Sequence, residues 1–367
     1  MTSTVTPDSP NTSVLEGVPG PLIPGTRHDV LIGDSAQAVM TRYWQYGKGM
    51  NGGTFPEGSY PVLLVHGFRG DHHGLEIIAN YLLKLIPNVS IISPDLPGFG
   101  RSADLPENAQ SADIQGKNSQ GADTQGGDNI NAYVAWLNDF VEHTNPARED
   151  AQPLPLHLVG HSFGSIVTSA FAAAHPNSLA LLSLINPISE PALEGSQRVA
   201  SRLASLYYRA GAALPEKIGY PLLRSQLITR ASSEVMMRTK DKAMRRFING
   251  QHAAYFGSFG SRRGVLSAYE ASITHTAAEY AAAIRVPVQM LVAEDDDLGT
   301  PETARAMYAT LTSRNLPVSH SLPATSTGAR ERLDMIPEVG HLIHYETPRR
   351  AAELIADFAA DHSGHEK

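Results

Sequence analysis

Short, almost continuously apolar segments recur along the chain, and longer segments with apolar residues at helical spacing separate them. The apolar segments span residues 61–65, 89–93, 156–159, 181–185 and 286–292. A parallel strand covered on both faces has this unbroken pattern, whereas a half-exposed strand alternates apolar and polar residues. The pattern therefore predicts an α/β fold, with a mostly parallel, doubly wound sheet between two layers of helices.

Three segments interrupt this alternation. Residues 1–29 are rich in Ser, Thr, Pro and Gly, so we expect a flexible arm before folding begins near Val30. Residues 104–128 are poor in large apolar side chains, which predicts a disordered surface insertion. Residues 189–274 have a helical pattern and are expected to form a helical lid. The core would then comprise residues 30–188 and 275–367.

The predicted lid is basic although the whole chain is acidic. It contains 13 Lys and Arg against 6 Asp and Glu, whereas the chain has a net charge of -8. One interpretation is a solvated basic helix face. The alternative is a surface that attracts an anionic substrate or an acidic membrane.

Overall composition excludes several classes of protein. A chain that is 42% apolar and 18% charged, with a modest negative charge, is typical of a soluble globular protein and not of a nucleic-acid binder. It has no cysteine, which excludes disulfides, Cys-ligated zinc and a Cys nucleophile. Neither a signal peptide nor an integral membrane segment is recognisable, so we expect a cytoplasmic protein. The oligomeric state stays open.

The strongest chemical signal is a Gly-x-Ser-x-Gly motif centred on Ser162, between an apolar strand and a helical segment. A sharp strand-to-helix turn requires glycine at positions 160 and 164 and exposes the serine hydroxyl. The start of the following helix offers free backbone N–H groups, among them that of Phe163, to a developing oxyanion. This context predicts that Ser162 is a nucleophile.

A serine nucleophile needs a base, and the base needs an acid that orients it. His341 follows Gly340 in a loop before the helix that Thr347 and Pro348 begin, and we predict that it is the base. His344 is interpreted as a packing residue or as a residue that supports the catalytic side chains from behind.

Four adjacent carboxylates are candidates for the acid. The apolar strand at 288–292 runs into Glu294, Asp295, Asp296 and Asp297, between the serine and the histidine in chain order. A solvated loop or a cation site are the alternative interpretations of this cluster.

The apolar segment at 61–65 leads into His66, Gly67 and Phe68. A glycine-bearing loop at this point is suited to supply a second oxyanion donor, the backbone N–H of Phe68. His66, His72 and His73 suggest a metal, but we find no carboxylate spacing that supports one. We therefore expect no metal, and we expect His66 to stabilise the loop.

Together these motifs resemble the α/β-hydrolase superfamily over residues 60–358, including the run from Pro94 to Ser102. The resemblance implies a Ser-Asp-His triad, two backbone oxyanion donors, a lid after the sixth strand and no cofactor. In the family pattern the acid strand ends Gly-x-x-Asp, with an apolar residue two positions later. Asp296 fits that frame, although Ala293 replaces the glycine, and Asp297 is the alternative.

The function that we expect is hydrolysis of a carboxylic ester through an acyl-enzyme on Ser162, with a small-molecule or acyl-chain ester as the partner. Three further possibilities stay open: a thioesterase or lipase-like enzyme, a carbon-carbon bond hydrolase, and a non-catalytic binding member of the fold. Arg69 or an arginine of the lid is a candidate to hold the dienolate that carbon-carbon bond hydrolysis requires.

Overall fold

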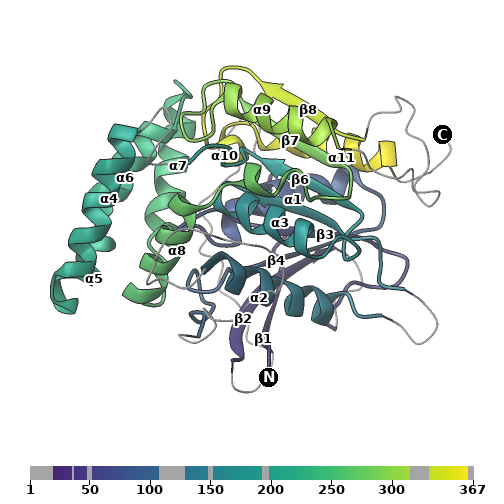
Figure 1. The fold of residues 1–367 in the computed structure, drawn as a ribbon, viewed down its shortest axis with the longest axis horizontal. Helices are drawn as coiled ribbons and strands as arrows, with labels where there is room; N and C mark the ends of the chain where they lie inside the picture. The colour runs from purple at the N-terminus through teal and green to yellow at the C-terminus, as the bar shows by residue number, and fades with distance from the viewer. Residues whose placement is uncertain are drawn as a thin grey trace.

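A computed structural model describes residues 20–34, 37–47, 52–106, 129–147, 152–191, 198–314 and 330–362 (Figure 1). An eight-stranded sheet of order β1-β2-β4-β3-β5-β6-β7-β8 forms its centre. Strand β2 pairs antiparallel with both β1 and β4, and the pairings from β4 to β8 in this order are all parallel. The strands are β1 (Thr26–Ile32), β2 (Val39–Gly47), β3 (Tyr60–Val65), β4 (Val89–Pro94), β5 (His157–His161), β6 (Leu181–Ile185), β7 (Val288–Ala293) and β8 (Arg332–Ile336).

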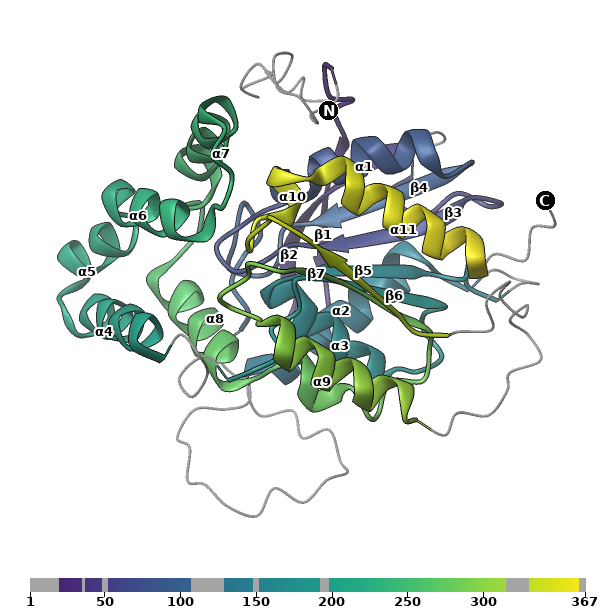
Figure 2. The same ribbon diagram turned by 90° about the horizontal axis from the view of Figure 1, so that it is seen from above.

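Helices cover both faces of this sheet, as Figure 2 shows. One face packs against α1 (His73–Leu85), α10 (Ile343–Glu346) and α11 (Pro348–His362). The other packs against α2 (Asn129–Thr144), α3 (Phe163–Ala174) and α9 (Pro301–Thr312). Alternate residues of the central strands belong to the two apolar clusters, because successive side chains of a strand point to opposite faces. The mostly parallel, doubly wound α/β fold predicted from the sequence is confirmed.

Five helices form an insertion between β6 and β7: α4 (Arg198–Ala213), α5 (Glu216–Leu223), α6 (Gln226–Met236), α7 (Lys242–Tyr255) and α8 (Arg262–Thr274). A short 3₁₀ helix (Ala277–Tyr280) follows. In both views α7 and α8 lie nearer the sheet, and α4, α5 and α6 form the end of the molecule beyond them (Figures 1 and 2). A third apolar cluster joins this insertion to α1 and α10, with Met237, Phe247 and Ile248 on one side and Ile77 and Tyr345 on the other.

The observed boundaries differ from the predicted ones at two places. Strand β1 begins at Thr26, four residues before the expected start of folding. Residues 1–19 of the expected arm and residues 107–128 of the expected disordered insertion lie outside the described residues. Asp104, placed in that insertion by the sequence, is instead held by the hydroxyl of Ser261 and by Arg263. Across the described helices, none combines the length and the apolar character needed to cross a bilayer.

Candidate active site

Ser162 occupies the turn between β5 and α3, with a backbone φ of 53° and ψ of -120°. This left-handed conformation is rare for a residue with a side chain and costs about 1–3 kcal/mol. Its amide N–H donates to the carbonyl of Ile185 at the end of β6 (3.1 Å), which fixes the turn to the neighbouring strand. The turn therefore holds the serine hydroxyl at the carboxyl edge of the sheet.

The two glycines of the motif permit close backbone approaches that a side chain would block. A Cβ atom at Gly160 would lie 2.6 Å from the carbonyl oxygen of Gly164, and one at Gly164 would lie 2.6 Å from the carbonyl oxygen of His66. Both distances are shorter than real Cβ contacts, and the obstacles are backbone atoms that cannot rotate away. The motif thus packs the elbow directly against the loop after β3.

The structure brings Ser162, His341 and Asp296 into one hydrogen-bonded row. Nε2 of His341 lies 2.8 Å from Oγ of Ser162, and Nδ1 of His341 donates to Oδ2 of Asp296 at 2.9 Å. Because the carboxylate accepts the Nδ1 proton, the neutral imidazole presents Nε2 as an acceptor for the serine hydroxyl. Ser162 is 9% exposed and His341 is 5% exposed, so the row is largely shielded from solvent.

The two candidate acids have different surroundings. Oδ1 of Asp296 accepts the backbone N–H of Leu298 at 2.8 Å, which leaves its other oxygen aimed at His341. Asp297 turns away and pairs with Arg238, which follows α6. The geometry therefore places Asp296, and not Asp297, beside the imidazole.

Asn186 supports this row, although its sequence context did not mark it as a site residue. Its amide Nδ2 donates to the carbonyls of Gly340 (3.2 Å) and His341 (2.9 Å), and its Oδ1 accepts the N–H of Ala293 (2.9 Å). One buried side chain after β6 therefore joins the end of β7 to the histidine loop. Its position directly after an apolar strand and before Pro187 was the available signal.

The backbone N–H groups that we expect to bind an oxyanion belong to Phe68 and Phe163, whose rings lie 6.4 Å apart. Phe163 is the first residue of α3, where an amide has no acceptor inside its own helix. Neither amide has an acceptor among the residues that the structure describes. His66 stabilises the loop after β3. Its Nδ1–H donates to the Gly67 carbonyl and its Nε2 accepts from the Leu96 amide, both at 2.8 Å.

Arg69 connects this loop to the insertion. Its backbone has a φ of 61°, and its guanidinium is buried. It donates to the carbonyl of Leu223 (2.7 Å), to the carbonyl of Phe256 (3.2 Å) and to the hydroxyl of Tyr208 (3.3 Å). A buried cation that binds three points of the insertion fixes the insertion relative to the neighbouring Phe68.

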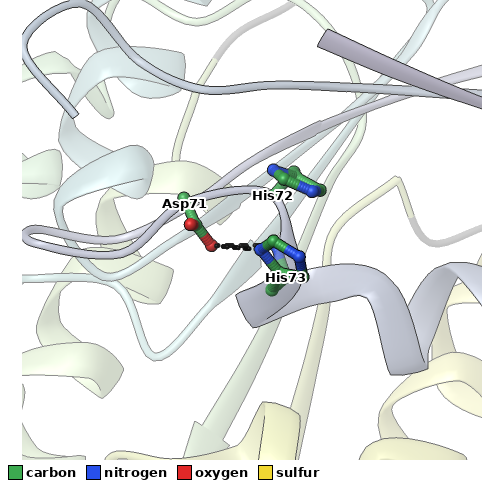
Figure 3. Close-up of side chains that lie close together, drawn as sticks. All are labelled: Asp71, His72 and His73. Atoms are coloured by element: carbon green, nitrogen blue, oxygen red, sulfur yellow. Dashed lines mark hydrogen bonds and ion pairs between the residues drawn. The ribbon is translucent and has the colours of Figure 1, made fainter. Parts of the chain in front are cut away.

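A cluster of Asp71, His72 and His73 lies where this loop enters α1 (Figure 3). Each side chain offers a metal-ligating atom within 4.8 Å of the others. Oδ1 of Asp71 accepts from Nδ1 of His73 (3.0 Å), and Oδ1 of Asp95 accepts from Nδ1 of His72 (2.8 Å). From the sequence spacing we expected no carboxylate beside these histidines. The fold does place the carboxylates of Asp71 and Asp95 next to them.

The carboxylates beside this cluster already accept hydrogen bonds from the imidazoles. Burial opposes a charge on His73, but the adjacent Asp71 carboxylate raises the pKa of His73 overall. Burial likewise opposes ionisation of Asp71, yet the nearby imidazoles lower its pKa. His73 thus supplies positive charge beside the buried Asp71, and the absence of a metal stays a prediction.

Several other histidines around the site are buried and neutral. Burial lowers the pKa of His161 to about 3, and the nearby His341 adds to the shift. Burial lowers the pKa of His252 to about 4 and that of His344 well below its usual range. His161 donates from Nε2 to the carbonyl of His341 at 3.3 Å, so a neutral imidazole helps to hold the histidine loop.

The fold and this edge of the sheet define the class of protein, which is an α/β protein with a serine-histidine-aspartate row at a strand-to-helix elbow. The family model of the alpha/beta hydrolase family matches residues 62–354, and the chain belongs to that family. The resemblance noted in the sequence is thereby confirmed.

Named relatives are distant. The chain is 22% identical to human monoacylglycerol lipase ABHD6 over 306 residues, which cover 82% of this chain and 75% of that protein. It is 26% identical to abhydrolase domain-containing protein abhd-5.2 of Caenorhabditis elegans over 151 residues. That match covers 41% of this chain and spans 28% of the length of the relative.

Solved structures show the same fold. A thermophilic esterase from Thermogutta terrifontis superposes with a TM-score of 0.57 and 21% identity, over 91% of this chain and 98% of that one. An esterase from Exiguobacterium antarcticum gives a TM-score of 0.60 at 14% identity, over 91% and 100% of the two chains.

The contacts of Asn186 lead to a first prediction. Replacement by alanine removes three buried hydrogen bonds and leaves backbone groups of Gly340, His341 and Ala293 without that partner, so we expect the free energy of unfolding to fall by about 2–4 kcal/mol. Urea denaturation measures this loss. Asn138→Ala, which removes an exposed bond to Glu142, is the matched control and should cost less than about 0.5 kcal/mol. Equal losses in the two variants would refute the role of Asn186.

The buried histidines lead to a second prediction, on stability against pH. A histidine whose pKa is lowered by folding binds a proton in the unfolded chain at pH values where the folded protein does not. Burial lowers the pKa of His157 and His161 to about 3 and that of His252 to about 4. Stability should therefore fall as pH drops below about 6.5, by up to about 1.4 kcal/mol per pH unit for each such group.

Four described groups, His73, Glu76, Asp139 and Glu346, have raised pKa values and oppose this trend. Nine described histidines have lowered pKa values, so we expect the decline to prevail. Melting temperatures at pH 7.5, 6.5 and 5.5 measure the effect. His344→Phe removes one of the neutral imidazoles and should make the decline shallower. A melting temperature that is constant or rises toward pH 5.5 would contradict the prediction.

Proposed function

We propose that the protein hydrolyses carboxylic esters through an acyl-enzyme on Ser162. The observation that carries the proposal is the hydrogen-bonded row of Ser162, His341 and Asp296, with distances of 2.8 and 2.9 Å. A serine hydroxyl becomes an effective nucleophile when a base accepts its proton and a carboxylate holds that base in the correct tautomer.

The proposed reaction has two halves, acylation and deacylation of Ser162. Oγ of Ser162 attacks the ester carbonyl carbon as its proton moves to Nε2 of His341. The oxyanion accepts hydrogen bonds from the amides of Phe68 and Phe163. His341 then gives the proton to the alkoxide as the carbon-oxygen bond breaks, which leaves the acyl group on the serine. Water repeats the sequence and releases the acid, while Asp296 stabilises the imidazolium in both halves.

The insertion serves as the lid of this site in our proposal. The ring of Phe68 lies 5.8 Å from that of Tyr208 in α4, and the ring of Tyr208 stacks on that of Tyr269 in α8 at 3.8 Å. These rings give the side next to Phe68 an apolar lining, which suits an apolar acyl or alcohol group. Ser162 and His341 are nearly buried, so in this proposal part of the lid moves when the substrate enters.

A lipase-like preference for long acyl chains is the second candidate. Two observations favour it over carbon-carbon bond hydrolysis and over a non-catalytic binding role: the aromatic lining of the insertion, and the likeness to a human protein named monoacylglycerol lipase. Hydrolysis of p-nitrophenyl esters from acetate to palmitate separates the two candidates, because a lipase-like enzyme should show kcat/KM that rises with chain length. A maximum at acetate would favour a small-ester hydrolase.

The third prediction concerns the nucleophile. A serine-directed fluorophosphonate should label Ser162, and Ser162→Ala should abolish labelling and lower kcat by about 10⁴-fold or more. Peptide mass spectrometry locates the label and ester turnover measures the rate.

Ser169→Ala is the matched control, because Ser169 lies on the same helix and its buried hydroxyl has no hydrogen-bond partner among the described residues. It should retain both labelling and turnover. A folded protein that neither reacts with the probe nor turns over esters would favour a non-catalytic binding role.

The fourth prediction separates the two aspartates. Asp296→Asn should lower kcat by about 10⁴-fold, because an amide cannot fix the Nδ1–H tautomer of His341. Asp297→Asn removes only a partly exposed ion pair with Arg238 and should change kcat less than threefold, since pairs near the surface contribute about 0–1 kcal/mol. The two variants carry the same chemical change at adjacent positions, so equal rates would exclude Asp296 as the acid.

A further inference from the structure

The outermost helices of the insertion expose large apolar side chains to an unusual degree. Leu203 and Leu206 of α4, Ile218 of α5, and Leu227 and Val235 of α6 are 57–82% exposed. Among the large apolar side chains that the structure describes, Leu31 on strand β1 is the one other that reaches this range. An exposed apolar surface that is concentrated on one part of a protein marks an interaction site.

Basic side chains accompany these apolar residues. Residues 198–236 contain six Arg or Lys against two Glu, in a chain whose net charge is -8. Four of the basic side chains, those of Arg202, Arg209, Lys217 and Arg230, are exposed and form no ion pair with any described residue. On α4 the spacing of Arg202, Leu206 and Arg209 places all three on one face of the helix.

The position of these helices suits contact with an extended surface. They form the end of the molecule that lies farthest from the sheet, beyond α7 and α8 (Figures 1 and 2). Nearer the core, Arg245 pairs with Glu234 and Arg262 donates to the carbonyl of Leu214, whereas Lys240, Lys242 and Arg246 at α7 are exposed. On α4, α5 and α6 exposed positive charge therefore occurs together with exposed large apolar side chains, which the described residues of α7 and α8 lack.

We propose that α4, α5 and α6 bind the surface of an anionic phospholipid bilayer. Apolar side chains of such helices enter the boundary between headgroups and acyl chains, and Arg and Lys side chains attract the anionic headgroups. A second copy of this chain is a less suitable occupant, because two such surfaces would bring their unpaired positive charges together. The proposal goes beyond ester hydrolysis and does not depend on the chemistry of Ser162.

Co-sedimentation with vesicles tests this binding. The full chain should sediment with vesicles of phosphatidylcholine and phosphatidylglycerol, and much less with phosphatidylcholine alone. Arg209→Gln combined with Arg230→Gln should weaken binding by roughly fivefold for each charge removed. Added salt at about 1 M should weaken binding to the anionic vesicles, because the Debye length shortens to about 3 Å.

Matched control variants test whether binding depends on where the charged and apolar residues lie, and not only on the net charge or the exposed apolar area of the whole protein. Arg285→Gln combined with Arg305→Gln changes the net charge equally on exposed residues of the core and should leave binding unchanged. Leu206→Ser combined with Leu227→Ser should weaken binding at least tenfold, whereas Leu31→Ser should not. Melting temperatures establish that each variant is folded, and Ser162→Ala should bind as the unchanged chain does.

Three results would overturn the proposal. The first is equal binding to neutral and anionic vesicles, or none to either. The second is an equal loss of binding in the core controls and in the insertion variants. The third is a dimer in sedimentation velocity that Leu206→Ser with Leu227→Ser dissociates, which would assign the surface to a second copy. Because Ser162→Ala is included, failure of membrane binding and failure of ester hydrolysis are distinguishable.

Discussion

The left-handed backbone at Ser162 is the constraint on which the rest of the site depends. A side chain in this conformation is unfavourable, so the turn must be held from several sides. Its N–H is bound to Ile185, and Gly160 and Gly164 allow contacts that no other residue permits. Strands β3, β5 and β6 therefore have to stand in their observed register before the serine hydroxyl can face His341.

The order of the parallel strands explains why distant segments meet here. Strands β3, β5, β6, β7 and β8 are consecutive neighbours in the sheet, so the loops at their carboxyl ends share one edge. Phe68, Ser162, Asn186, Asp296 and His341 come from these five loops in that order. Asn186 occupies the middle loop, which allows one short side chain to bond both the acid strand and the histidine loop. The site therefore forms where these five loops meet at one edge of the sheet, and no single sequence motif contains it.

The sequence predicted the five central strands because each is apolar on both faces, but it did not predict β8. Arg332 and Asp334 interrupt that edge strand, and four of its five residues are only partly buried. Spacing alone could not separate Asp296 from Asp297, since the choice depends on a backbone turn that directs one to His341 and the other to Arg238. The hydrogen bond between His72 and Asp95 could not be predicted either, because 23 residues separate them in the chain.

The insertion has two different chemical surfaces. Toward the core, buried polar contacts such as those of Arg69 hold it in a defined position relative to the loop after β3. Away from the core, Leu227 and Arg230 of α6 are exposed, and Arg230 forms no ion pair with a described residue. Leaving a large apolar side chain exposed gives up about 1.5–3 kcal/mol that burial would provide. Folding alone gives no reason for five such residues on three adjoining helices, and a partner that contacts this surface supplies one.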